Sequence, residues 1–132
     1  MTQQIAFQTL ENVKLLNAHE ILYCQADKDC CLVYLKTNAH FVASERLGQI
    51  EKKLTAPKFF RCHKSYIINI QSIREYNHSK NLILLERGFE IPLAHRRKCK
   101  FMKLIKNLHI AIGGGVIVRF KLHERWQRRV AA

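Results

Sequence analysis

The segment from Phe59 to Asn69 carries polar side chains between two apolar runs that resemble strands: Arg61, His63, Lys64 and Ser65. Cationic and hydroxyl groups of this kind can donate hydrogen bonds to phosphates or to base edges. Cys62 next to His63 suggests a different chemistry, that of a nucleophile beside its base. Neighbouring residues of an extended chain point to opposite faces, so their thiol and imidazole seldom meet. The segment therefore favours binding over catalysis.

A second group of basic and titratable side chains follows a predicted strand: His95, Arg96, Arg97, Lys98 and Lys100. An arginine can bind O6 and N7 of guanine with two hydrogen bonds, and a lysine can neutralise a phosphate as a point charge. The alternative is a solvated face of a helix. In a chain this cationic, the density of positive charge favours the binding interpretation.

The net charge indicates a polyanionic partner. The chain has 23 Lys and Arg residues against 10 Asp and Glu, which gives +13 with neutral histidines. From Ala94 onward there are eleven basic residues and one acid, Glu124. Such a surface suits nucleic acid, although anionic lipid and acidic proteins are alternatives on charge alone.

Other classes of function find little support. The five cysteines are odd in number and form no Cys-x-x-Cys pair, which argues against a disulfide framework and a zinc site. The seven histidines lack metal-ligand spacing, and no phosphate-binding glycine loop is present. We expect no cofactor, no metal and no catalytic residue. No segment is long and apolar enough for a membrane span, and the first residues do not resemble a signal peptide, so we expect a cytoplasmic protein.

The pattern of apolar residues predicts a mostly β fold with short helices. A hairpin is expected from Ile21–Cys24 and Cys30–Leu35, turning at Asp27–Asp29, and a further strand at His40–Ala43. Ser44 is a candidate N-cap for a short helix, about residues 44–54, which Pro57 would stop.

After Pro57 the pattern predicts a meander of short strands and then a helix. The expected strands include Tyr66–Ile70, Ile73–Tyr76, Asn81–Glu86 and Phe89–Leu93, with a turn at Asn77–Lys80 and a tight hairpin at Arg87-Gly88. Pro92 places the last strand at a sheet edge because it lacks an N–H. The helix, about residues 94–108, has one apolar and one basic face.

Residues 109–132 have no secure assignment from the sequence. Three glycines, at residues 113–115, separate two short apolar runs, and a basic stretch follows. A hairpin, a flexible joint to a basic helix and a partner-binding segment are all open. We therefore expect a domain over 1–108 and a basic C-terminal extension over 109–132.

Two motifs resemble the LytTR domain of bacterial response regulators. The segment Phe59-Phe60-Arg61-Cys62-His63-Lys64-Ser65-Tyr66-Ile67-Ile68-Asn69 is similar to that family's signature, and Ile91-Pro92-Leu93-Ala94-His95-Arg96-Arg97 is similar to its Ile-Pro-Val-Ser-Arg-Arg. The resemblance covers about residues 5–108. It implies an elongated stack of small antiparallel sheets that binds DNA through loops in successive major grooves.

The resemblance also implies roles for particular residues. Contacts to bases map onto the Lys28–Cys31 region, with Lys28, Asp29 and Cys31 as candidates, and onto Lys64 and Arg96. Candidates near phosphates are Arg61, Ser65, Arg97, Lys98 and Lys100, and His63 and His95 complete the predicted site. This chain departs from the family at Ala94, where Ser is usual, and at Cys30-Cys31, where some members have a polar residue or histidine.

The sequence therefore predicts a transcriptional regulator that binds double-stranded DNA sequence-specifically, as a homodimer or as tandem copies on repeated half-sites. It would be a stand-alone member without a receiver domain, whose C-terminal extension could bind a protein partner. The main alternative is an RNA-binding or ribosome-associated protein that stacks bases on Tyr66 or Tyr76. An enzyme using Cys62 and a membrane-surface protein are further alternatives.

Overall fold

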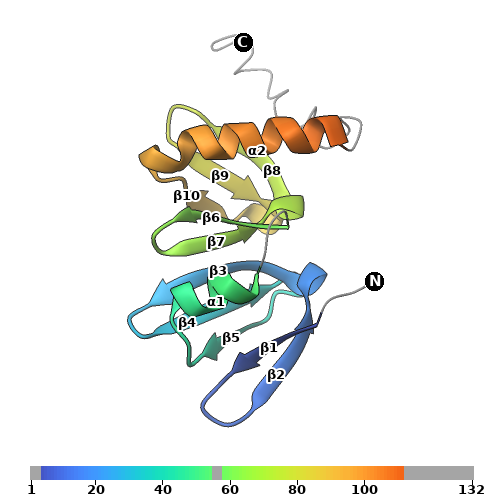
Figure 1. Cartoon of the computed structure of the whole chain (residues 1–132), viewed down its shortest axis with the longest axis vertical. Coiled ribbons are helices and arrows are strands. Elements are labelled where there is room, and N and C mark those ends of the chain that lie inside the picture. Colours follow the sequence, from blue (N-terminus) through green and yellow to red (C-terminus); the bar gives the residue numbers. More distant parts are fainter. Residues whose placement is uncertain (1–3, 55–57, 112–132) are drawn as a thin grey trace. The chain divides into compact units, whose positions relative to one another are not determined.

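The structure, a computed structural model, describes residues 4–54 and 58–111 and falls into two compact units, Met1–Gln71 and Ser72–Ala132 (Figure 1). The described part contains three antiparallel sheets, one short helix and a longer C-terminal helix. The predicted mostly β fold with two helices is confirmed.

The N-terminal unit is built on a five-stranded antiparallel sheet with the order β5-β4-β3-β7-β6. Its strands are β3 (Ile21–Asp27), β4 (Cys30–Leu35), β5 (His40–Ala43), β6 (Phe59–His63) and β7 (Tyr66–Asn69). Short 3-10 turns, Ala18–Glu20 and Ile70–Ser72, precede β3 and follow β7. The predicted hairpin that turns at Lys28 is confirmed as β3–β4, and Asp27 pairs with Cys30 across its end.

The position of each strand in the sheet explains its sequence. β4 alternates, with Cys31 and Val33 buried in the core and their neighbours partly exposed. β3 is the central strand, and its first four residues, Ile21–Cys24, are all buried. A continuous apolar run is typical of a strand covered on both faces, whereas alternation is typical of one covered on a single face.

The face of this sheet opposite Cys31 and Val33 carries a row of aromatic rings, one from each strand. Tyr23 stacks on Tyr34 with ring centroids 4.5 Å apart, and Tyr34 lies 5.2 Å from the ring of His40. On the other side, Tyr66 lies 6.2 Å from Tyr23 and 5.6 Å from His63. Cross-strand aromatic pairs of this kind each contribute roughly 0.2–1 kcal/mol and help to fix the register of the sheet.

The short helix α1 (Leu47–Lys53) packs Leu47 and Ile50 into the core. The prediction that Ser44 caps this helix is wrong. Arg46 occupies the N-cap position, and its N–H donates to Oε1 of Gln49. Ser44 instead follows β5 and donates its N–H to the carbonyl of Gln8, at 2.7 Å. Pro57, the predicted helix stop, lies outside the described residues.

An N-terminal hairpin that the sequence did not predict joins this core. It consists of β1 (Gln4–Gln8) and β2 (Val13–Asn17), and Ile5 and Phe7 of β1 are buried. Glu45 accepts hydrogen bonds from the N–H of Gln8, at 2.8 Å, and from Nζ of Lys53, at 2.6 Å. The carboxylate of Glu45, only 10% exposed, therefore joins the hairpin to α1.

The C-terminal unit pairs a three-stranded sheet with the long helix. The sheet has the order β10-β9-β8 and consists of β8 (Ile73–Asn77), β9 (Leu82–Leu85) and β10 (Glu90–Pro92). The expected edge position of the strand that contains Pro92 is confirmed. The turn at Asn77–Lys80 is also confirmed, because Oδ1 of Asn77 accepts the N–H of Lys80. A 3-10 turn, Glu86–Gly88, joins β9 to β10, and Arg87 and Gly88 both have positive φ there.

Helix α2 (Lys98–Ala111) lies against this sheet (Figure 1). Phe101 and Ile105 are buried, and the ring of Phe101 meets that of Tyr76 edge to face at 5.3 Å. The hydroxyl of Tyr76 donates to Oδ1 of Asn81, and burial raises the pKa of this phenol to about 12. The α-helix begins at Lys98, later than the predicted 94, because His95–Arg97 form a 3-10 turn. Expectations for residues 112–132 lie outside the described residues.

Candidate nucleic-acid interface

The turn between β6 and β7 presents Lys64 to solvent from a fixed backbone. Nδ1 of His63 accepts the N–H of Ser65 at 3.1 Å, and the ring of His63 packs edge-on against Tyr66. The carbonyl of Ser65 accepts the N–H of Ala26 on β3, at 2.8 Å. Lys64 is thus exposed at the tip of a turn that its neighbours hold on both sides.

Arg61 stabilises this turn by hydrogen bonds to its backbone carbonyls. Its Nη2 donates to the carbonyl of Lys64 at 2.5 Å, and its Nε donates to the carbonyl of His63 at 3.4 Å. Its Nη1 lies 2.9 Å from Oε1 of Glu51 on α1. A planar guanidinium suits such divergent contacts. The predicted phosphate contact of Arg61 stays a prediction. Its hydrogen bonds indicate that Arg61 positions the backbone of Lys64.

The turn between β3 and β4 lies at the same end of the sheet. β7 runs antiparallel to β3, with Tyr66 opposite Gln25, so the start of β7 adjoins the end of β3. Lys28 and Lys64 therefore project from two turns at one end of the five-stranded sheet. Asp29 forms an exposed ion pair with Arg46, 3.1 Å apart, which brings a further cation to this end. Arg46 was not predicted as a site residue. The only signal for it in the sequence is its position just before the short helix.

Lys28 has a backbone conformation that lysine rarely adopts. Its φ is +60°, in the left-handed region that favours glycine. We expect Lys28→Gly to raise the free energy of unfolding by about 0.5–1 kcal/mol, because glycine adopts a positive φ without strain. The same variant should weaken DNA binding, because it removes a positive charge. Urea denaturation and a DNA titration at one salt concentration would measure both effects.

Arg87→Gly is the matched control for Lys28→Gly. Arg87 also has positive φ, +70°, in an exposed turn outside the predicted contacts. It should show a similar gain in stability with a smaller loss of DNA affinity. Equal losses of affinity in the two variants would argue that Lys28 supplies only general charge.

Cys31 and Cys62 are buried and are not placed for chemistry at the surface. Cys31 is fully buried in the core, and burial, followed by the proximity of Cys30, raises the pKa of its thiol to about 11. Cys62 is also buried, and its Sγ lies 3.9 Å from the carbonyl of Tyr66. Nδ1 of His63 accepts the N–H of Ser65. We therefore leave Cys31 out of the proposed interface.

The basic residues of the C-terminal unit surround the start of α2. His95, Arg96 and Lys100 are exposed, and Arg97 and Lys98 are half-buried. Arg96, Arg97 and Lys100 line a shallow cavity of about 340 Å³. The partial positive charge at a helix N-terminus adds to these cations, so the cavity suits a phosphate-sized anion. Lys98 lies near His78 and, after the larger effect of burial, contributes to the lowering of that imidazole's pKa.

Within residues 4–54 and 58–111, no group of three or more His, Cys, Asp or Glu side chains is arranged to hold a metal ion. No helix in the same part of the chain is long and apolar enough to cross a membrane.

Residues 11–106 match the protein family described as the LytTr DNA-binding domain. The chain belongs to the LytTR family. It is similar to the transcriptional regulatory protein YpdB of Escherichia coli K12, with 27% identity over 99 residues, 72% of this chain and 40% of YpdB. It is also similar to the sensory transduction protein LytT of Bacillus subtilis, with 29% identity over 107 residues, 77% of this chain and 43% of LytT. The chain thus spans about two fifths of these LytTR relatives.

A solved structure supports the LytTR fold. The LytTr DNA-binding domain of a methyl-accepting/DNA response regulator from Bacillus cereus superposes with a TM-score of 0.65 at 23% identity, covering 77% of this chain and 95% of that domain. The predicted LytTR resemblance and fold class are therefore confirmed. LytTR is a family of DNA-binding regulator domains and not of enzymes, in agreement with the predicted absence of catalysis.

Proposed function

We propose that this LytTR protein is a transcriptional regulator that binds double-stranded DNA sequence-specifically, with its turns in the major groove. The observation that carries the proposal is the placement of Lys28 and Lys64 on two turns at one end of the five-stranded sheet. A turn can place one or two long side chains against base edges, as a recognition helix does in other folds. The net charge of +13 would supply the sequence-independent attraction to phosphates.

In this proposal Lys64 and Arg96 contact bases. Both side chains are exposed, each beside a backbone that hydrogen bonds hold in place. Residues proposed to lie near phosphates are Ser65, Arg97, Lys98 and Lys100, while Arg61 positions the turn of Lys64. Lys28 and Asp29, with His63 and His95, complete the proposed surface.

The relatives support a regulatory role by their names, a transcriptional regulatory protein and a sensory transduction protein. We propose that the DNA-binding domain comprises residues 1–108 and that residues 109–132 form an extension which could bind a protein partner. We also propose that two copies bind repeated half-sites, as a homodimer or in tandem, since one domain of this size covers only a short stretch of DNA.

Arg96→Ala tests the assignment of a base contact. We expect it to cost about 1–3 kcal/mol on specific DNA and to relax discrimination at one base position, because an arginine can bind guanine with two hydrogen bonds. Fluorescence anisotropy with specific and random duplexes measures both. Equal losses on the two duplexes would contradict this role.

Lys98→Ala is expected to behave differently. A phosphate contact carries no sequence information, so affinity should fall alike on specific and random duplexes. The slope of log affinity against log salt should decrease in magnitude by about 1. An unchanged slope would contradict the assignment of Lys98 as a phosphate contact.

A competition experiment tests the proposed function as a whole. Labelled duplex DNA bound to the full chain is challenged with unlabelled duplex DNA and with single-stranded RNA of equal length at matched salt. We expect duplex DNA to compete better. Stronger competition by RNA would favour the RNA-binding alternative, in which half-buried Tyr66 stacks on unpaired bases.

A further inference from the structure

A short turn of the C-terminal unit, between β8 and β9, lies beside the segment that precedes α2. Leu82, at the start of β9, is opposite both Asn77, the last residue of β8, and Pro92, the last residue of β10. The N–H of Leu93 donates to the carbonyl of Asn81, at 2.9 Å. The β8–β9 turn and the residues that follow β10 therefore emerge at the same end of this sheet.

The side chains of the β8–β9 turn, residues 77–81, are polar or basic. Ser79 and Lys80 are exposed. Oδ1 of Asn77 accepts the hydroxyl of Ser79 at 2.9 Å and the N–H of Lys80 at 3.0 Å, so hydrogen bonds fix the backbone of the turn. Neither this turn nor residues 94–100 contain an acidic residue. The turn therefore adds positive charge to the basic segment at the start of α2.

The ring of Tyr76 connects His78 of this turn to helix α2. The imidazole of His78 meets this ring edge to face at 4.8 Å, and Phe101 of α2 meets it at 5.3 Å. Burial, followed by the charge of Lys98 at the start of α2, lowers the pKa of His78 from its ordinary value, whereas burial raises the pKa of the Tyr76 phenol to about 12. At neutral pH both side chains are therefore uncharged, beside a cation.

A phosphate beside Lys98 would reverse the effect of this lysine on His78. An anion that binds Lys98 and Lys80 also lies close to the imidazole, and a nearby negative charge favours the protonated form. A protonated imidazole donates from both ring nitrogens, so it can add a charge-assisted hydrogen bond to a phosphate oxygen. Binding of a phosphate at this turn is therefore expected to be coupled to uptake of a proton from solvent.

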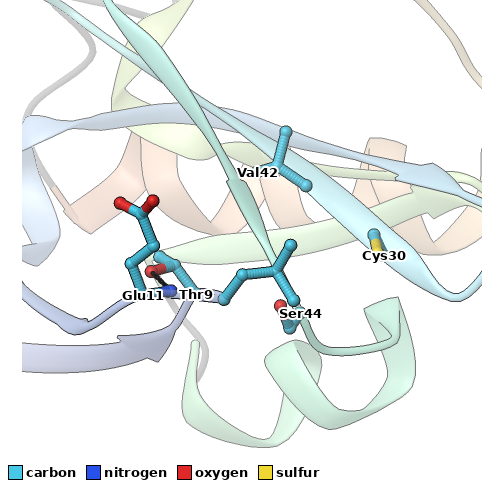
Figure 2. Close-up of a pocket in the computed structure, with 6 residues that line it drawn as sticks. Thr9, Glu11, Cys30, Val42 and Ser44 are labelled. Carbon is cyan, nitrogen blue, oxygen red and sulfur yellow. Dashed lines mark hydrogen bonds between the residues drawn. The ribbon is translucent and has the colours of Figure 1, made fainter.

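A groove in the N-terminal unit differs from this surface in charge. It measures about 260 Å³ and is lined by Thr9, Leu10, Glu11, Cys30, Val42 and Ser44 (Figure 2). Its charged lining residue in the described part of the chain is an acid, Glu11, so it does not suit a phosphate. The cavity at the start of α2 is lined by Arg96, Arg97 and Lys100, and the β8–β9 turn lies beside the segment that contains the two arginines. Phosphate therefore suits the surface that includes this turn.

We propose that the β8–β9 turn belongs to the DNA-contacting surface, where Lys80 and the protonated imidazole of His78 contact backbone phosphates beside Lys98, and that DNA binding takes up a proton at His78. The proposal rests on the proposed function for the choice of DNA as the partner. Contacts to phosphates carry no sequence information, so the same proton uptake is expected on any duplex.

Fluorescence anisotropy with a random duplex at fixed salt, from pH 8 to pH 5.5, tests the proton uptake. His78→Phe keeps a ring against Tyr76 but binds no proton. We expect the affinity of the wild type to rise as the pH falls, by about three- to tenfold more than that of His78→Phe, since a shift of one pKa unit corresponds to a tenfold change. The other histidines are present in both proteins, so their contribution cancels. His19→Gln, at an exposed position of the N-terminal unit, should respond like the wild type.

Lys80→Ala tests the turn without altering His78. We expect it to weaken binding to the random duplex and to decrease the slope of log affinity against log salt by about 1. Lys106→Ala is the matched control, because Lys106 is also exposed and lies roughly two helical turns beyond Lys98 on α2. It should change the affinity and the slope less than Lys80→Ala does. Both lysines are exposed, so neither variant is expected to disturb folding.

The outcomes separate this inference from the proposed function. A pH response of His78→Phe equal to that of the wild type, or equal effects of Lys80→Ala and Lys106→Ala, overturns the inference. A wild type that binds no duplex overturns both. A response that depends on His78, without preference for any DNA sequence, supports the inference and contradicts sequence-specific regulation. Sequence preference without that response supports the proposed function and excludes the turn from the DNA-contacting surface.

Discussion

Replacing Phe101 with alanine should lower the free energy of unfolding of the C-terminal unit by about 3–5 kcal/mol, the usual cost of removing a buried aromatic side chain. Phe101 is fully buried on α2, and its ring packs on that of Tyr76. It is the largest fully buried side chain of the helix within the described residues. Loss of this contact would loosen α2 from the sheet and release the basic residues at its start, so DNA affinity should fall as well. Urea denaturation followed by circular dichroism measures the change.

Lys103→Ala is the control for Phe101→Ala. Lys103 lies two residues further along α2 and is exposed. Its replacement should change the free energy of unfolding by less than about 0.5 kcal/mol. If Phe101→Ala proved as mild as Lys103→Ala, the packing of α2 on its sheet would not be the source of stability of this unit.

Arg61→Ala should affect both the stability of the N-terminal unit and its recognition of DNA. Its guanidinium donates to two turn carbonyls and pairs with Glu51, and only 22% of its side chain is exposed. Hydrogen bonds from charged groups contribute about 1.5–3 kcal/mol each, and exposed ones contribute less, so we expect a loss of stability of about 1–2 kcal/mol. Lys64 would then lose its fixed position, and discrimination between specific and random duplexes should decrease.

Two further variants separate the positioning role of Arg61 from its charge. Arg61→Lys keeps the charge but cannot make the divergent hydrogen bonds, so specificity should still decrease. Arg74→Ala removes a cation that is 44% exposed and 3.8 Å from Glu86, and should leave specificity unchanged. Full rescue of specificity by Arg61→Lys would show that charge alone matters at this position.

Local sequence patterns predicted much of the fold because strand, turn and apolar periodicity are local properties. The β3–β4 hairpin follows from two apolar runs around Asp27–Asp29, and the edge position of β10 follows from the missing N–H of Pro92. The LytTR motifs then identified the family. The first motif spans β6 and β7, and Lys64 lies in the turn between them; in the second motif, His95–Arg97 form a 3-10 turn after β10.

Contacts between distant segments could not be predicted in this way. Ser44 is a residue type that often caps helices, but it directly follows β5, and its N–H pairs with the carbonyl of Gln8, thirty-six residues earlier in the sequence. The β1–β2 hairpin was missed because Val13 and Leu15 of β2 stay exposed, so its apolar residues do not mark a buried face. The hydrogen bonds of Arg61 and the burial of Cys31 likewise depend on the assembled sheet.

Selection of bound sequences from a pool of random duplex DNA tests the central claim most directly. We expect the full chain to enrich one recurrent motif, repeated as two half-sites, and Arg96→Ala to lose preference at one position of that motif. A pool that shows no enrichment after repeated rounds, while the protein still retains DNA through charge, would contradict sequence-specific recognition by these turns.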